Sequence, residues 1–167
     1  MAKAKINGKA TPITPKQLLA QWLPLRFQFQ LAVWNFQTEA GRAAVDVFQQ
    51  SFDLGRFNST GELPWKERKR PRPHPILNET GTLKNSIKSE WTKDSKTVRV
   101  YTDPSAFGTA ARHKGFCYAA IHNDPSGSHT YGASGVPSQQ RQFMGYSDVL
   151  KKKMNKLVLK IFEKFPK

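Results

Sequence analysis

The feature that most constrains the fold is a run of positions, spaced alternately by three and four, that is mainly apolar and ends just before Gly55. Its members are Phe27, Leu31, Trp34, Thr38, Gly41, Val45, Phe48 and Phe52. This alternation is typical of one face of an α-helix, and a glycine suits the helix end. We therefore predict a helix of about seven turns, whose aromatic face needs a sheet or another subunit to cover it.

The residues before this run predict a basic arm and a first helix. Residues 1–13, which include Lys3, Lys5 and Lys9, are basic and small, and we expect them to form a flexible arm. Thr14 and Pro15 are a good N-cap and a good first helical residue. Pro24 is expected to end that helix or to kink it.

A long loop is predicted over residues 55–75. Prolines keep its second half extended, and a basic cluster lies within it: Lys66, Arg68, Lys69, Arg70 and Arg72. Loops of this length in a compact domain are usually functional or disordered. The loop and the basic arm are therefore our candidates for contacts with neighbouring molecules.

The centre of the chain carries β signals. Residues 86–92 and 97–102 favour strands, and residues 93–96 suit the turn of a hairpin. Residues 116–121 suit either a third strand or a helical turn. Residues 123–139 have turn chemistry and predict a second long loop. Phe143 and Met144 are expected to form a short edge strand.

A second amphipathic helix is predicted near the C-terminus. Ser147 is a suitable N-cap, and Asp148 in the first turn favours the helix dipole. The apolar stripe is Leu150, Met154, Leu157, Val158, Ile161, Phe162 and Phe165. The lysines of the opposite side are Lys152, Lys153, Lys156, Lys160 and Lys164.

Composition bounds the class of protein. A length of 167 residues suits a single domain, here residues 14–167. The net charge of +15 favours polyanions or acidic protein surfaces as neighbours. Cys117 is the only cysteine, so no internal disulfide can form. Neither a secretory signal nor a membrane-spanning stretch is expected, and the prediction is a soluble protein without a membrane partner.

No pattern of catalytic residues emerges. The series His113, Cys117, His122 and His129 matches no standard zinc-ligand spacing. The acidic residues are scattered singly, without a close pair suited to acid–base chemistry, and phosphate-binding and hydrolase motifs are missing from the sequence. We therefore expect no enzymatic activity, no metal and no cofactor.

Nucleic-acid binding is the main alternative function. Lysine and arginine cluster in residues 1–13, in residues 66–72 and on the C-terminal helix, and such clusters can neutralise phosphates. The aromatic residues follow core spacing rather than alternating with the basic ones, so base stacking is not indicated.

Several short motifs occur together in a distinctive order. They are Phe48-x-x-x-Phe52, Leu63-Pro64-Trp65-Lys66, Thr80-Gly81-x-Leu83, Tyr118-Ala-Ala-Ile-His122 and Gln140-Arg-Gln-Phe-Met-Gly145. This series, over roughly residues 40–165, resembles the phage virion morphogenesis (tail-completion) family of Mu-like phages.

The resemblance implies an α+β fold, with a long N-terminal helix and a C-terminal helix packed on a small, mainly antiparallel β-sheet. Gly81 would take a positive φ angle, and Leu83 and Ile87 would pack inward. Trp65 would plug the start of the 55–75 loop. Arg141, if buried, would need an acidic or carbonyl partner in a contact that pins a loop or joins subunits.

The function implied is structural. Such a protein would form a ring of identical subunits in the virion neck, completing the tail and joining it to the head as a head–tail connector. Its partners would be its own copies, portal-side adaptor and tail proteins, and packaged DNA without sequence specificity. It would be found in the virion neck or tail and, during assembly, in the host cytoplasm. A tail-tube terminator is a further alternative.

The residues assigned by this reasoning to assembly contacts are Lys3, Lys5, Lys9, Trp65, Lys66, Arg68, Lys69, Arg70, Arg72, His122, Arg141 and Phe143.

Overall fold

The fold is dominated by one long helix, α1 (Pro15–Leu54). The computed structural model describes residues 14–68, 71–92, 94, 97–107, 118–131 and 136–163. As predicted, Thr14 caps α1 in a capping box with Gln17, and Gly55 ends it in the left-handed conformation at φ 62°. Pro24 lies inside the helix and does not end it.

Two helices of very different length and a hairpin pack around α1. The helix α4 (Asp148–Phe162) begins at the predicted N-cap Ser147, whose side chain accepts a hydrogen bond from the amide of Leu150. The strands β1 (Ile87–Trp91) and β2 (Val98–Thr102) form an antiparallel hairpin in which Ile87 pairs with Thr102. Of the predicted turn, residues 93, 95 and 96 lie outside the described residues. The short helix α2 (Thr82–Asn85) leads into β1.

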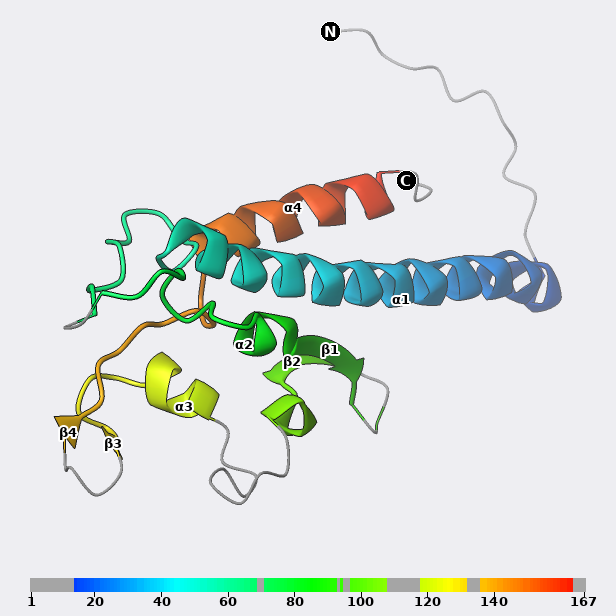
Figure 1. Ribbon diagram of the computed structural model, residues 1–167. Coiled ribbons are helices and arrows are strands. Elements are labelled where there is room, and N and C mark those ends of the chain that lie inside the picture. The colour runs from blue at the N-terminus through cyan, green and yellow to red at the C-terminus, as the bar shows by residue number, and fades with distance from the viewer. Residues whose placement is uncertain are drawn as a thin grey trace, which may run out of the picture.

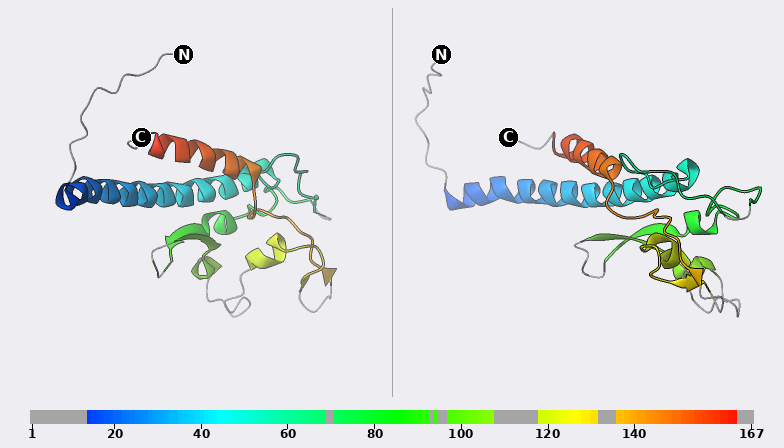
Figure 2. Two further views of the ribbon diagram at one scale, coloured as in Figure 1. Left: turned by 180° about the vertical axis from the view of Figure 1, so that it is seen from behind. Right: turned by 90° about the vertical axis from the view of Figure 1, so that its left-hand side faces the viewer.

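The α+β class is confirmed, with a more specific arrangement than predicted. The hairpin lies on one side of α1, and α4 lies on the other side (Figure 1; Figure 2). The C-terminal helix therefore covers α1 and not the sheet. Because α1 has neighbours on two sides, it is the central layer of the molecule.

The core lies where the C-terminal half of α1 meets the segments that follow it. Val47, Phe48 and Phe52 of α1 are buried together with Leu83 and Ile87. The last two pack inward across α2, as expected. Gly81 precedes α2 with a φ of 73°, which also agrees with the sequence expectation.

The remaining segments are short. A 3₁₀ helix, η1 (Pro104–Phe107), follows β2. Residues 118–123 form a helix, α3 (Tyr118–Asn123), and this settles the choice between strand and helix for the described part of 116–121. Within the predicted loop 123–139, β3 (Thr130–Tyr131) pairs with β4 (Val136–Pro137).

The edge strand predicted at Phe143 and Met144 is wrong. Their amides donate to the side-chain Oδ1 of Asn123, at 3.1 Å for Phe143 and 2.9 Å for Met144. A side chain thus takes the place of a neighbouring strand, so this segment is held in an irregular conformation.

Candidate assembly site

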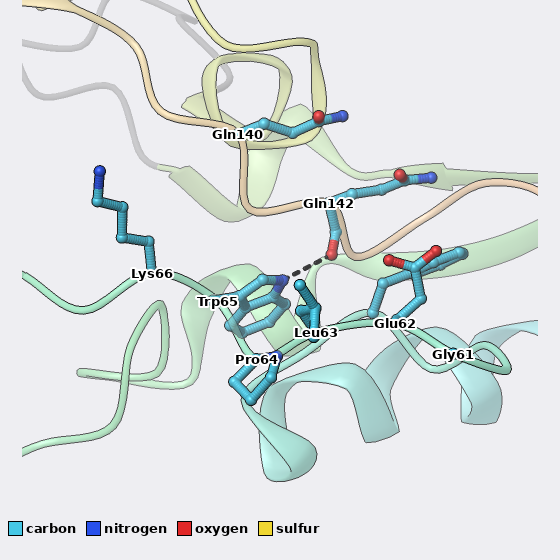
Figure 3. Close-up of a pocket in the computed structure, with 9 residues that line it drawn as sticks. Gly61, Glu62, Leu63, Pro64, Trp65, Lys66, Gln140 and Gln142 are labelled. Atoms are coloured by element: carbon cyan, nitrogen blue, oxygen red, sulfur yellow. Dashed lines mark hydrogen bonds between the residues drawn. The ribbon is translucent and has the colours of Figure 1, made fainter.

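Trp65 fixes the first part of the 55–75 loop. Its backbone amide donates to the carbonyl of Gly55 at 2.7 Å, next to a β-bridge between Arg56 and Pro64. The indole Nε1 donates to the carbonyl of Gln142 at 2.9 Å (Figure 3). With 7% of its surface exposed, Trp65 is the buried plug that the sequence predicted.

Two further aromatic rings, those of Phe52 and Phe143, pack with this plug. The ring of Phe52 lies 5.7 Å from that of Trp65, edge to face, and 5.2 Å from that of Phe143. Contacts of this geometry add to the free energy gained by burying the rings. Phe143 is 1% exposed. Trp65 and Phe143 therefore offer little side-chain surface to a partner in the folded chain.

Arg141 ties the same loop to α3. Its backbone amide donates to the carbonyl of His122 at 2.7 Å. Its Nη2 donates to the carbonyl of Lys66 at 3.3 Å, and the Nε is buried without a partner among the described residues. The carbonyl partner expected for Arg141 is thus present, and the contact pins a loop within the chain.

His122 is held in its neutral form beside this contact. Burial, and secondarily the charge of Arg141, lower the pKa of His122 from 6.5 to about 4. The ring of Tyr118 meets the imidazole edge to face at 6.2 Å. At neutral pH the residue adds no positive charge, so it acts by packing rather than as a cationic contact.

We call this group the loop junction: Trp65, His122, Arg141 and Phe143, with Phe52 beneath them. It joins the start of the 55–75 loop, the end of α3 and the segment before α4, which are far apart in the sequence. A shallow cavity of about 360 Å³ lies over it, lined by Leu63, Pro64, Trp65, Gln140 and Gln142 among others (Figure 3). Four of the five motifs that carry the family resemblance therefore contribute a residue to one place, and Thr80-Gly81-x-Leu83 lies outside it.

The basic loop leaves from this junction. Arg68 donates to the carbonyls of His74 at 3.0 Å and Pro75 at 2.9 Å, so its charge holds the loop's own backbone. Lys66 is exposed. Arg72 is also exposed and lies 3.9 Å from Glu79. Of the basic cluster, Lys66 and Arg72 are therefore the described residues whose side chains are exposed to a neighbour.

Five of the predicted contact residues cannot be placed. Lys3, Lys5 and Lys9 lie outside the described residues, as do Lys69 and Arg70. The assignment of all five to assembly contacts stays a prediction.

The N-terminal part of α1 was misjudged from the sequence. Phe27, Leu31 and Trp34 were predicted to face the core, yet each is more than half exposed. Every described side chain from residue 14 to residue 31 is exposed. The helix projects past the ends of α4 and the hairpin (Figure 1), and periodicity alone cannot show where a helix outruns its cover.

The outer face of α4 is basic. Lys152, Lys156 and Lys160 are exposed, as the amphipathic pattern predicted. Leu159 breaks this face with an exposed apolar side chain. Lys153 is half-buried and, with Lys156 and Lys160, lines a groove between α4 and α1 that also contains Glu39 and Asp46.

Within the described part of the chain, histidine, cysteine and acidic side chains do not gather in a group of three or more that could hold a metal ion. His113 and Cys117 lie outside that part. Among the helices described, none combines the length and apolar character needed to cross a membrane.

Comparison of the chain with protein-family models, with curated proteins and with solved structures found no match.

Proposed function

We propose that this protein is a structural subunit of a phage virion, which completes the tail and joins it to the head as part of a neck ring. The observation that carries the proposal is the loop junction. Four of the five motifs that resemble the tail-completion family contribute a residue to it, although these residues are spread from Phe52 to Phe143.

The junction suits a structural task. It holds the first part of the 55–75 loop by hydrogen bonds to backbone carbonyls, one of them donated by the Arg141 guanidinium, and by contacts between aromatic rings. A loop that leaves a rigid base can present its basic residues in a fixed direction. The exposed Lys66 and Arg72 are therefore placed to contact an acidic surface of an adjacent ring.

Quantitative mass spectrometry of purified virions tests this proposal. We expect the protein at a few copies to about a dozen per particle, as for a ring closed by cyclic symmetry. Its absence from the particles would contradict a neck role. A position at the far end of the tube, located by immunolabelling, would favour the tail-terminator alternative.

A charge reversal sharpens the test at the level of residues. The double variant Lys66→Glu with Arg72→Glu should lower the yield of particles with joined heads and tails in a complementation assay. The matched control is Lys152→Glu with Lys156→Glu on α4, which makes the same change in net charge. Equal loss from both pairs would argue against a specific role of the loop.

Nucleic-acid binding remains the second candidate, because the exposed lysines of α4 form a basic face. If the charge reversal at Lys152 and Lys156 abolished function and the reversal at Lys66 and Arg72 did not, a DNA titration at several salt concentrations would follow. Phosphate neutralisation predicts that the logarithm of affinity falls linearly with the logarithm of salt concentration.

A further inference from the structure

The first 14 residues of α1, Pro15 to Gln28, form a bare segment that we call the helical arm. They lie N-terminal to the place where α4 reaches α1, at the contact between Phe29 and Phe162. Among the described residues, the side chains of these four helical turns are exposed, and several of them are large and apolar.

Two apolar stripes of α1 continue along this arm. On the side of α4, Phe29 contacts Phe162 at 6.1 Å, and Trp22 and Leu25 continue the line at helical spacing. On the side of the hairpin, Trp34 stacks on Trp91 at 6.2 Å. Phe27 and Leu23 continue that second line toward the N-terminus.

The two stripes lie on different sides of the helix. At 100° per residue, Phe29 and Trp34 are separated by about 140° around the axis. In the body of the protein, α4 covers one side of α1 and the hairpin covers the other. Both covers stop short of the arm (Figure 1; Figure 2), which is left bare on two sides.

The bare surface is as large as a protein interface. Eight large apolar residues of the arm and of the turns that follow it have exposed fractions from 36% to 66%. Five of them belong to the arm (Leu19, Trp22, Leu23, Leu25 and Phe27), and three follow it (Phe29, Leu31 and Trp34). Taken together they expose on the order of 1,000 Å², whereas a stable interface buries roughly 800 Å² per partner. An apolar patch of this size marks an interaction site.

The charges of the arm favour a second copy of this chain as its neighbour. Lys16 and Arg26 are its only charged residues, and Glu39 is the first acidic residue of α1. Gln17, Gln21 and Gln28 provide uncharged amides that can hydrogen-bond with their own kind. The arm thus brings two like charges per copy to the contact, and salt weakens the repulsion between such exposed charges. A membrane-surface helix, by contrast, typically carries many lysines and arginines on its polar face.

We propose that the helical arm is the surface through which copies of this chain assemble, with each arm packed between the arms of two others. A two-fold pair would cover one stripe and leave the other bare, so the contacts require more than two copies. This inference rests on the proposed function for the idea that the copies form a ring. The exposed stripes are the surface through which the copies would contact one another.

The mass of the full-length chain in solution tests the inference. Light scattering and sedimentation equilibrium at micromolar concentration should show assemblies larger than dimers. Trp22→Gln removes an anchor of the stripe on the α4 side, and Phe27→Gln removes one of the stripe on the hairpin side. Each variant should weaken self-association by roughly 30-fold or more, as truncation of an aromatic anchor does at other interfaces. The double variant should be monomeric.

The controls separate assembly from folding and from lipid binding. Leu159→Gln alters another exposed apolar residue, 71% exposed on α4, and should leave the mass unchanged. Helix content measured by circular dichroism should be similar in all variants. A monomeric wild-type chain, or a double variant that assembles as the wild type does, would overturn the inference. So would flotation of a monomeric wild-type chain with phosphatidylglycerol vesicles that the double variant does not bind.

The two proposals fail separately. A chain found at ring copy number in virions but monomeric in solution would retain the neck function and lose the arm inference. A chain that assembles through the arm but is missing from virions would do the reverse.

Discussion

Gly41 is the point where α1 comes closest to the hairpin. A Cβ atom at this position would lie 2.7 Å from Cγ1 of Val98 and 3.1 Å from Cβ of Ser89. Glycine costs a helix interior about 1 kcal/mol relative to alanine. In the sequence, Gly41 stands out only as one member of the mainly apolar run, because spacing shows which face a residue occupies and not how near the next layer lies.

Substitution of Gly41 tests this contact. Gly41→Ala should lower the free energy of unfolding by about 1–2 kcal/mol despite its better helix propensity, because Val98 is branched and cannot easily move away. Urea denaturation measures the change. In a double-mutant cycle, Val98→Ala should recover part of the loss. A Gly41→Ala variant as stable as the wild type would show that the hairpin is free to shift.

His122 predicts a specific dependence of stability on pH. Its folded pKa, about 4, lies below its ordinary value of 6.5, so the unfolded chain binds more protons between these values. The free energy of unfolding therefore holds its full value, as far as His122 is concerned, above about pH 6.5. It should fall by roughly 2–3 kcal/mol as the pH is lowered toward 4. The free energy of unfolding, measured from pH 7 to pH 4, should fall less steeply in His122→Gln than in the wild type.

A second group titrates outside this window. Hydrogen bonds from Lys88 and Ser105 lower the pKa of Asp103 to about 2, so its effect on stability appears below about pH 4. Parallel curves for the wild type and His122→Gln between pH 7 and pH 4 would contradict the assignment to His122.

At the scale of elements, α1 consists of two parts that differ in support. From Gly41 to Phe52 it is packed by other segments, whereas the helical arm relies on its own hydrogen bonds. Pro24 lacks an amide proton, so the arm also has one backbone hydrogen bond fewer. Local stability should therefore decrease toward the N-terminus of the helix.

Hydrogen exchange of the unassembled chain can measure this difference. We expect the amides of residues 18–28 to exchange much faster than those of residues 44–52. Pro24→Ala should increase protection on the arm, since proline costs a helix interior about 3 kcal/mol. The double variant Trp22→Gln with Phe27→Gln provides the unassembled background. Equal protection along all of α1 would mean that the arm is covered even in that background.

The sequence predicted where helices begin and end better than it predicted which elements pack against one another. Thr14, Gly55 and Ser147 act locally, through side chains or backbone angles within a turn of their own position, so a short motif was enough to identify them. The packing of α4 on α1 and the link from Trp65 to Gln142 join residues far apart in the chain. Only the tertiary structure brings such pairs together. The irregular segment at Phe143 depends on another contact of this kind, the hydrogen bond from its amide to the side chain of Asn123.

At the scale of the whole molecule, the fold and the assembly function should be separable. Deletion of residues 1–12 leaves the capping box at Thr14 in place. We expect the shortened chain to keep its helix content and its unfolding midpoint, and to lose efficiency in virion assembly. Circular dichroism and a complementation assay measure the two effects. A loss of helix content or of solubility would instead assign these residues to the fold.

The length of α1 also determines how the molecule moves through water. A helix of 40 residues is about 60 Å long, whereas a compact domain of this chain length has a radius of gyration of about 15 Å. A single copy is therefore elongated along α1, and its frictional drag exceeds that of a sphere of the same mass. It should elute early from a sizing column, so an apparent mass calibrated with globular standards would exceed the mass of a single copy.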